Sequence, residues 1–319
     1  MAVYTQVSAE ALGAFLARFD HGELVSAKGI AEGVENSNYL VDTTKGRFIL
    51  TLYEKRVDLD DLPFFFAMID HLGAHALPVP RALPDRDGVV IHQLEGRPAC
   101  LIEFLTGVSV SHPTPAQAFA AGAALGQMHA ALADFPLTRV NSMGVDSWRP
   151  LFDRCGRDLD GIAPGLYDSV GFALDQVLAD WPAGLPTGTV HADLFPDNVL
   201  MRGDAVTGLI DFYFACTDIR AYDLAVMHTA WSFDATGTNA DWAVGRALIQ
   251  GYTQSIDLTA DERAALIQLA QGACIRFLLS RAWDWLNTPA DALVTRKDPL
   301  AYLRRLNAYA ARTTPLDIA

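Results

Sequence analysis

Two short segments of the chain carry side chains that suit phosphoryl transfer. Residues 191–198 read HADLFPDN, and residues 209–214 read LIDFYF. Nucleotide phosphates are handled together with Mg²⁺, which prefers a small number of carboxylate and amide oxygens as protein ligands. Asp211 can supply a carboxylate and Asn198 an amide oxygen. Asp193 lies five residues before Asn198, so it can face the same ion without binding it and accept the proton of an attacking hydroxyl.

We therefore predict Asp193 and His191 as catalytic residues, with His191 holding the loop by hydrogen bonds, and Asn198 and Asp211 as metal ligands. Two other interpretations compete. The acidic groups could form a solvated turn with helix caps, or Asp193 and Asp211 could belong to a metal hydrolase. The order of loop, hairpin and Asp-Phe favours phosphoryl transfer, and histidines that would support a hydrolase site are missing.

The composition sets limits on partners and location. The chain has 319 residues, is 51% hydrophobic and carries a net charge of −14, from 24 Lys and Arg against 38 Asp and Glu. Such an acidic protein is not expected to bind nucleic acid or an anionic membrane. The sequence shows no long apolar span, and its N-terminus reads as a helix capped by Ser8 rather than a signal peptide. The four cysteines lack C-x-x-C spacing, so we expect reduced, buried thiols and a cytoplasmic protein, with no protein zinc site.

The elements that must position these residues divide the chain into two parts. The first hundred residues are rich in strand patterns, including GVENSNYLVDTT and GRFILTLYE on either side of a Lys45-Gly46 turn. A helical pattern, LPFFFAMIDHLGAHAL, interrupts them, and a hairpin through GVVIHQL and PACLIEFL follows. From about residue 105 a connector leads into helices, two of which open with capping boxes at Thr114 and Thr259. The exception is a hairpin turning at Gly203-Asp204, beside the acidic loop.

These motifs resemble a known superfamily. HADLFPDN resembles the H-x-D-x-x-x-x-N loop of the aminoglycoside phosphotransferase-like kinases, a branch of the protein-kinase fold. IDFYFA is similar to the metal-binding segment of that superfamily, and AYDLAVMHTAW to the following helix, in which Asp223 would brace the catalytic loop. The resemblance covers roughly residues 25–290. It implies a two-lobed α+β protein-kinase-like fold, with a nucleotide-binding lobe over residues 1–105 and a helical catalytic and substrate lobe over residues 106–319.

The resemblance also implies where ATP binds. LIEFLTG, residues 101–107, looks like the hinge, where backbone groups near Glu103 and Leu105 would meet the adenine. EGVENSN is the candidate phosphate loop, in which Gly33 permits close backbone approach. Its amide and hydroxyl donors are Asn36, Ser37 and Asn38.

The sequence differs from the kinase pattern at the residues that bind the ATP phosphates. The kinase fold places a Lys or Arg on the third strand and a Glu in the next helix. The corresponding strand position here is Thr51, and the helix position falls within LPFFF. Lys55 and Lys28 are the candidate substitutes.

Residues that could bind the acceptor follow from a closer resemblance. Within the superfamily, GIAEGVENSNYLV, FILTLYEKR and LPFFFAMIDHL look most like the bacterial homoserine kinase family. This resemblance implies ATP and L-homoserine as substrates and Mg²⁺ as cofactor. An arginine is the natural partner for a carboxylate, and the candidates are Arg276 and Arg281. Tyr213 and Asp218 follow the metal-binding Asp, and Asp218 could meet an ammonium group.

Two alternatives remain open at this point. The chain could phosphorylate another small hydroxyl compound, such as a choline-like molecule, a sugar or an aminoglycoside. It could also be a nucleotide-binding module without catalysis, an idea prompted by the departures at the strand and helix positions. The oligomeric state is open as well, with a homodimer among the options.

Overall fold

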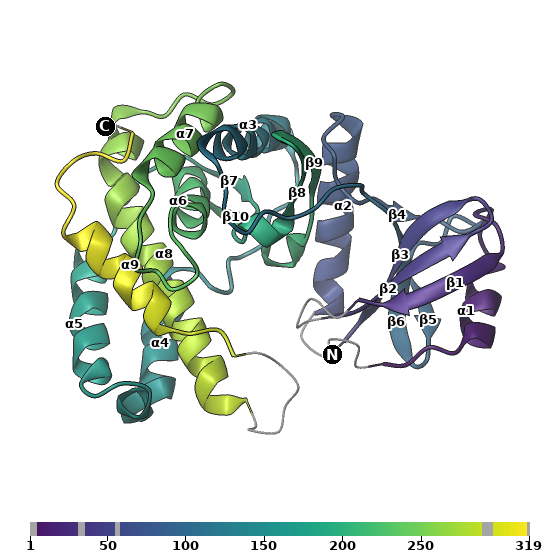
Figure 1. The fold of residues 1–319 in the computed structure, drawn as a ribbon, viewed down its shortest axis with the longest axis horizontal. Coiled ribbons are helices and arrows are strands. Elements are labelled where there is room, and N and C mark those ends of the chain that lie inside the picture. Colours follow the sequence, from purple (N-terminus) through teal and green to yellow (C-terminus); the bar gives the residue numbers. More distant parts are fainter. Residues whose placement is uncertain (1–4, 31–35, 55–57, 289–295, 318–319) are drawn as a thin grey trace.

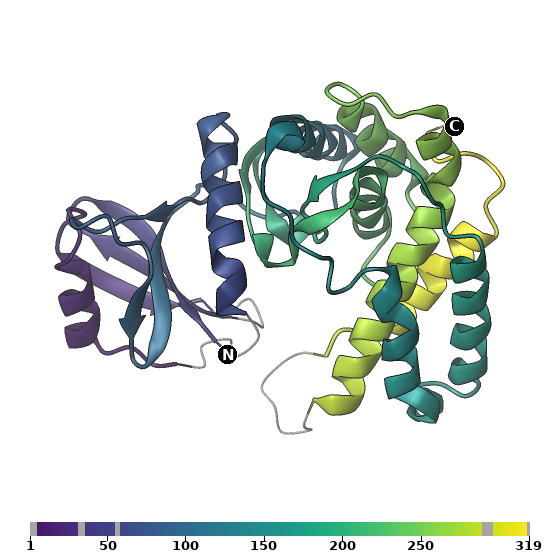
Figure 2. The same cartoon turned by 180° about the vertical axis from the view of Figure 1, so that it is seen from behind.

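The computed structural model describes residues 5–30, 36–54, 58–288 and 296–317, and all structural statements refer to these residues. The expected α+β arrangement is confirmed. Figure 1 shows a β-sheet lobe at one end, a helical lobe at the other, and helix α2 standing between them; the reverse view in Figure 2 agrees. Elements of the first lobe, with η for 3₁₀ helices, are α1 (Ala9–Leu16), β1 (Leu24–Gly29), β2 (Asn36–Thr43), β3 (Gly46–Tyr53), η1 (Leu59–Asp61), α2 (Leu62–Ala74), β4 (Ala82–Leu83), β5 (His92–Leu94) and β6 (Arg97–Glu103).

The sheet of the first lobe is antiparallel throughout and has the strand order β1-β2-β3-β6-β4, with β5 also pairing with β6. The predicted turn is confirmed, because Thr43 pairs with Gly46 at the end of the β2–β3 hairpin. Helix α1 begins as expected at Ser8, whose Oγ accepts a hydrogen bond of 3.1 Å from the backbone N–H of Ala11. The apolar side chains of α1 and one face of the sheet form a small core of their own.

Helix α2 belongs to a different core. Its side chains Phe65, Met68 and Leu72 are buried in the large apolar cluster that fills the helical lobe. Tyr53 at the end of β3 and Cys100 in β6 join the same cluster. The packing of α2 therefore links the first hundred residues to the helical lobe, and the domain division at residue 105 stays a prediction.

The helical lobe contains two short two-stranded sheets. Its elements are α3 (Pro115–Ala131), η2 (Leu132–Asp134), α4 (Val145–Cys155), η3 (Gly156–Gly161), α5 (Leu166–Ala179), β7 (Thr187–Val190), η4 (Pro196–Asn198), β8 (Val199–Arg202), β9 (Ala205–Leu209), η5 (Phe212–Phe214), β10 (Cys216–Ile219), α6 (Arg220–Trp231), α7 (Trp242–Tyr252), α8 (Ala260–Asn287) and α9 (Leu300–Ala310). Both predicted capping boxes are confirmed, at the starts of α3 and α8. The predicted hairpin is β8–β9, and β7 pairs with β10.

The connector between the lobes is held to the hairpin. Val108 and Met201 exchange two backbone hydrogen bonds of 3.0 and 2.9 Å, so the chain leaving β6 is fixed against β8 before α3 begins. The four cysteines are free thiols and are buried, as expected. Among the described helices, none combines the length and apolarity required to cross a membrane.

Candidate active site

The acidic loop connects two short strands of the helical lobe. It leaves β7 after Val190, passes Asp193 and ends in the 3₁₀ turn η4, from which β8 starts. The Asn198 side chain closes this loop: its Nδ2 donates to the backbone carbonyl of Asp193 at 2.8 Å and lies 3.3 Å from the Asp193 carboxylate. The amide is therefore oriented by Asp193, and the two residues that the sequence paired are in contact.

Asp223, in the first turn of α6, binds the beginning of the loop through hydrogen bonds to its backbone. Its carboxylate accepts the backbone N–H groups of His191 and Ala192, both at 2.8 Å, and the ring of His129 at 3.0 Å. Burial by itself would raise the pKa of Asp223, but the hydrogen bond and the charge of His129 outweigh it and the pKa is lowered. His129 in turn contacts the Tyr252 hydroxyl at 2.9 Å. The bracing role that the resemblance implied for Asp223 is thus present as hydrogen bonds.

Ala192 takes an unusual conformation that the surroundings maintain. Its φ of +63° lies in the left-handed region, which is costly for a residue with a Cβ. Arg276, buried on α8, donates from Nη1 to the carbonyl oxygen of Ala192. Trp231 Nε1 donates to the carbonyl of Leu194 at 3.0 Å. The carbonyls on either side of Asp193 are therefore held by hydrogen bonds from two different helices, α8 and α6. These two bonds together keep the loop in one conformation.

The second candidate ligand follows β9 directly. Asp211 also has a left-handed backbone, with φ +64° and ψ 63°. The preceding residue, Ile210, donates its N–H to the carbonyl of Asn198 at 3.0 Å and accepts at its own carbonyl from His191 Nε2, also at 3.0 Å. The side chain of His191 is buried, so its place is beneath the loop, where it ties the Asp193 segment to the Asp211 segment.

The charges in this site favour a cation. Burial raises the pKa of Asp193 to about 8 against the lowering effect of Arg276, and the neighbouring charge of Asp211 raises it further. Asn198 uses its amide nitrogen on Asp193, which leaves its Oδ1 as the oxygen donor beside two carboxylates. Oxygen donors of this kind fit a hard divalent cation such as Mg²⁺, and the electrostatic strain between Asp193 and Asp211 is what such a cation relieves.

The predicted phosphate-loop residues lie partly outside the described chain. Gly33 does, as does Lys55. Asn36, Ser37 and Asn38 do not form a loop but begin strand β2. Ser37 Oγ donates to Glu54 Oε1 at 2.7 Å, and Asn36 Oδ1 accepts from the Glu54 N–H at 3.4 Å. These polar groups form hydrogen bonds with Glu54 at the end of the β2–β3 pair, next to the residues that the structure does not describe.

The departure at the third strand has a clear structural form. Thr51 is buried and its Oγ1 donates to Asn38 Oδ1 at 2.7 Å, so this pair occupies the position where a kinase lysine is expected. The first turns of α2 carry Phe64 and Phe65, which are buried in the large core, and the ring of this helix that contacts β3 is Phe66, edge-on to Tyr53. Lys28 lies exposed on β1, one strand further out.

The hinge residues lie where β6 ends. Glu103 is the last residue of β6, and its N–H donates to the carbonyl of Arg81 at 3.0 Å. Its carboxylate forms an ion pair with the same arginine at 2.8 Å. Leu105 packs close to Gly208 in β9. The side chain of Glu103 is thus held by Arg81 at the end of β6, so the predicted contact with adenine would use main-chain groups.

Two of the proposed acceptor residues have protein partners. The Tyr213 ring packs edge-on against Tyr53 and Phe65, which places it at the junction of the lobes. Asp218 accepts from the side chain of Asn141 and from the backbone of Ile219. In the β7–β10 pair, Asp218 lies opposite Gly188, two residues before the end of β7. Asp218 is therefore further from the loop that carries Asp193 than Cys216, which lies opposite Val190.

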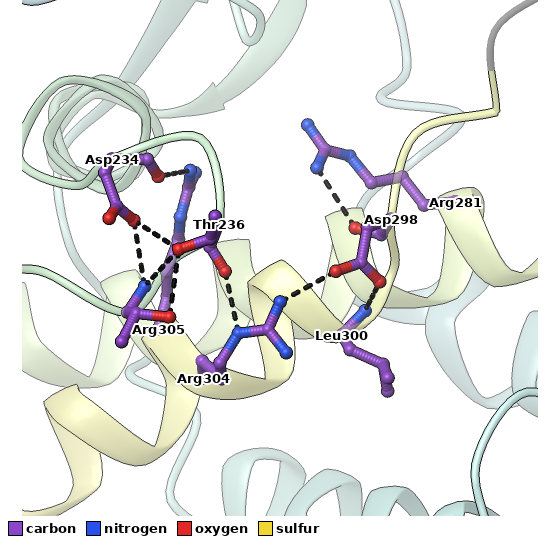
Figure 3. Close-up of polar contacts among 8 residues, drawn as sticks. Asp234, Thr236, Arg281, Asp298, Leu300, Arg304 and Arg305 are labelled. Atoms are coloured by element: carbon purple, nitrogen blue, oxygen red, sulfur yellow. Dashed lines mark hydrogen bonds and ion pairs between the residues drawn. The ribbon is translucent and has the colours of Figure 1, made fainter.

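The two arginines differ in their surroundings. Arg276 is buried and holds the loop at Ala192, whereas Arg281, one helical turn further along α8, lies over the Tyr302 ring and donates weakly to the carbonyl of Asp298 at 3.4 Å. Figure 3 shows Arg281 extending from α8 toward Asp298, apart from the arginines of α9. Burial lowers the pKa of Arg281. The negative charge of Asp193 is one of the effects that oppose this lowering, so the two side chains attract each other electrostatically.

Lys297 is a functional candidate that sequence reasoning did not identify. It lies exposed just before α9, and its charge helps to lower the pKa of Asp193. Nothing in the local sequence marks this lysine, because about one hundred residues separate it from the acidic loop. The one available signal was that lysine is rare in this chain, where it occurs at four positions.

The arrangement, a braced Asp-bearing loop followed by a hairpin and a second Asp beneath a β-sheet lobe, defines the class of kinase-like phosphotransferases. Comparison with protein families agrees, since the model of the phosphotransferase enzyme family matches residues 26–265. The chain belongs to this family.

Close relatives extend over almost the full length. A homoserine kinase of Xanthobacter autotrophicus is 50% identical, covering 98% of this chain and 97% of the relative. The homoserine kinase of Zymomonas mobilis is 53% identical, with 97% of each chain covered. Among solved structures, amicoumacin kinase hAmiN aligns with a TM-score of 0.69 at 14% identity, covering 96% of this chain and 94% of the other. Choline kinase from Cryptosporidium parvum aligns at 0.67 and 14%, covering 95% and 94%. These structures establish the protein-kinase-like fold.

Proposed function

We propose that this protein transfers the terminal phosphoryl group of ATP to the side-chain hydroxyl of L-homoserine, giving O-phospho-L-homoserine, a step toward threonine. The observation that carries the choice of acceptor is the homoserine kinase name of relatives that are 50–53% identical over nearly the whole chain. Solved structures at 12–18% identity have names with varied acceptors, so they inform the fold alone.

The catalytic step is assigned to Asp193. Its position on a loop fixed by Asp223, Arg276 and Trp231 supports this role, because phosphoryl transfer depends mainly on positioning and on charge neutralisation. The carboxylate orients the acceptor hydroxyl and takes up its proton as the oxygen bonds to the terminal phosphorus of ATP and the bond from that phosphorus to the oxygen of the departing ADP breaks. His191 is a positioning residue, since its buried ring joins the loop to the segment before Asp211.

Asn198 and Asp211 are proposed to hold Mg²⁺ with the nucleotide. When bound there, the ion supplies positive charge that neutralises the phosphate oxygens. The adenine is proposed to meet main-chain groups near Glu103 and Leu105 at the end of β6. The start of β2 would then face the phosphates, and Gly33, which the sequence predicted to meet them, lies outside the described residues.

The acceptor carries a carboxylate and an ammonium group besides its hydroxyl. The carboxylate requires a cation near Asp193. Arg281 and Lys297 both interact electrostatically with Asp193, and neither is committed to the loop in the way that Arg276 is. We therefore propose Arg281 as the main partner of the homoserine carboxylate, with Lys297 beside it. A cytoplasmic location fits an enzyme that draws on ATP.

The test is release of ADP from Mg²⁺-ATP in a coupled assay with chosen acceptors. We expect turnover with L-homoserine, confirmed by a phosphomonoester signal in phosphorus NMR. Two matched compounds each lack one charged group: 3-aminopropanol has no carboxylate and 4-hydroxybutyrate no ammonium. Loss of a charge-assisted contact is worth about 1.5–3 kcal/mol, so each should react roughly ten- to a hundredfold less efficiently. Equal rates with choline or 3-aminopropanol would overturn the choice of acceptor while leaving the kinase assignment intact.

A further inference from the structure

Two histidines and an aspartate, residue types that can bind metal ions, lie close together at the C-terminal end of helix α2. His71 and His75 lie on the last turn and the C-cap of α2, and Asp134 is the last residue of η2 in the helical lobe. Their potential ligand atoms all lie within 4.8 Å of one another. The expectation that the chain has no zinc site overlooked the four-residue spacing of His71 and His75, which places two imidazoles on one helix face.

A hydrogen bond to the backbone fixes the tautomer of the His75 ring. Its Nδ1 lies 2.9 Å from the carbonyl oxygen of His71, and a carbonyl can only accept, so Nδ1 carries the hydrogen. In the neutral ring this leaves the Nε2 lone pair available. Metal-binding histidines typically donate their second N–H to a backbone carbonyl in this way, which fixes both tautomer and ring direction.

The distance between the other two ligands also fits. His71 Nε2 lies 3.3 Å from Asp134 Oδ1. Bonds of roughly 2.0–2.2 Å from zinc to nitrogen and oxygen, in tetrahedral geometry, separate two ligand atoms by about 3.3–3.5 Å. His71 Nε2 also lies 2.8 Å from the carbonyl of Ala131, so an ion must replace the hydrogen that this contact uses. Without a bound ion, His71 donates to the carbonyl of Ala131 and His75 donates to the carbonyl of His71, and these hydrogen bonds hold the end of α2.

We propose that His71, His75 and Asp134 form a surface site for a divalent transition-metal ion of the zinc class. The three protein ligands leave a fourth position for water, as in open zinc sites. The site joins α2 to η2, and the start of α2 is already tied to the helical lobe by an ion pair of 2.7 Å between Asp61 and Arg139. Metal binding therefore fixes the second end of the helix that lies between the lobes. This proposal does not depend on the identity of the acceptor.

The test uses Co²⁺ as a spectroscopic probe on the untagged full-length protein, without nucleotide. We expect one equivalent of Co²⁺ to produce the visible absorption of a site with nitrogen ligands, and Zn²⁺ to displace it. His75→Asn should weaken binding at least about tenfold, because removing even an outer partner of a metal ligand costs ten- to a hundredfold. His112→Asn, at another exposed histidine, is the matched control and should bind like the parent protein.

Two further measurements distinguish this surface site from the proposed catalytic metal site and from nonspecific metal binding. Asp211→Asn should retain the Co²⁺ signal, because the proposed catalytic metal site lies elsewhere. Zn²⁺ should raise the melting temperature of the parent protein and not that of His75→Asn, since a ligand stabilises only the state that binds it. His75 is exposed, so the variant should fold normally, and far-ultraviolet circular dichroism checks this. Equal Co²⁺ affinity in the parent and in His75→Asn, or loss of binding with Asp211→Asn, overturns the proposal.

Discussion

At the scale of single residues, the site concentrates backbone strain. Four residues other than glycine have a left-handed backbone in the described chain, and two of them, Ala192 and Asp211, flank the candidate active site. Each such residue costs about 1–3 kcal/mol and persists only where neighbours fix it. Here His191 binds the carbonyl before Asp211, and Arg276 binds the carbonyl of Ala192. The two strained residues therefore lie in the segments that carry Asp193 and Asp211, and each is held by a hydrogen bond from outside its own segment.

The first prediction concerns the base. Asp193→Asn removes the proposed proton acceptor and should lower kcat by about 10²–10⁴-fold, the usual contribution of a positioned general base. ATP affinity should change little, because Asp193 is not assigned to the metal or the nucleotide. Steady-state kinetics together with equilibrium nucleotide binding measure the two effects separately. A variant with the turnover of the parent enzyme would remove Asp193 from the mechanism.

The second prediction separates the two arginines. Arg281→Ala should raise the KM for homoserine by roughly ten- to a hundredfold with the KM for ATP nearly constant, because a charge-assisted contact to the carboxylate is lost. Arg276→Ala should instead lower kcat and thermal stability, because it frees the carbonyl of Ala192 and leaves the loop less fixed. Steady-state kinetics with each substrate varied in turn distinguish these patterns.

Lys297→Ala is the comparison variant for this experiment, since Lys297 is a second cation near Asp193. A moderate rise in homoserine KM is expected. If Arg276→Ala alone affects homoserine KM, and Arg281→Ala has no effect, the carboxylate contact belongs to Arg276.

The sequence could identify candidate site residues but not all of the contacts that hold them. Asp193, Asn198 and Asp211 lie within twenty residues, and the Gly203-Asp204 turn between them predicts the hairpin that separates the loop from the second carboxylate. The contact of Arg276 with Ala192 spans 84 positions, and no local pattern predicts it. The same holds for Lys297, whose nearness to Asp193 depends on how α8 and α9 pack.

At the scale of elements, local signals predicted boundaries well. Both capping boxes begin helices as expected, because the cap hydrogen bonds are made within four residues. The placement of α2 was not predictable in the same way. Its apolar side chains suit any core, and only the tertiary structure shows that they are buried with the helical lobe. Asn36, Ser37 and Asn38 were expected in a loop, but the structure has them as the first residues of strand β2.

The third prediction tests the contact between α3 and α7. A Cβ added at Gly122 would lie 2.0 Å from the carbonyl oxygen of Leu248, which is backbone and cannot move aside cheaply. Gly122→Ala should therefore force the helices apart and destabilise the protein by about 3 kcal/mol or more, at the upper end for overpacking. Thermal unfolding followed by circular dichroism measures the loss.

Gly13→Ala is the matched control for this substitution. Gly13 lies inside helix α1, and a Cβ there meets nothing within 4 Å. Alanine is the better helix former, so this variant should be as stable as the parent or more stable by up to about 1 kcal/mol. Equal melting temperatures for Gly122→Ala and the parent would contradict the close approach of the two helices.

At the scale of the whole molecule, the buried apolar side chains of the described residues form two main cores and a third, minor cluster of Val190, Ala192 and Cys216. The small core joins α1 to the sheet, whereas the large core runs through the helical lobe and includes α2. The large core also contains buried polar groups that must stay uncharged or paired. His228 on α6 is one of these: its Nδ1 contacts the Tyr309 hydroxyl of α9 at 2.6 Å, and the ring is buried. Protonation of such a group opposes folding.

The last prediction follows from this histidine. Burial, with a smaller effect from Arg312, lowers the pKa of His228 from 6.5 to about 3. Below pH 6.5 the unfolded chain takes up a proton that the folded protein does not bind, so stability is present above that pH and declines as pH falls toward 3. At pH 5 the loss from this residue is about 2 kcal/mol. His228→Asn should be less stable than the parent at pH 7.5 but lose less stability between pH 7 and pH 5, measured by urea unfolding across that range. Some decline should remain, because burial also lowers the pKa of His191. His112→Asn, at an exposed position, should follow the parent curve, and a His228→Asn curve parallel to the parent would show that His228 does not control the acid response.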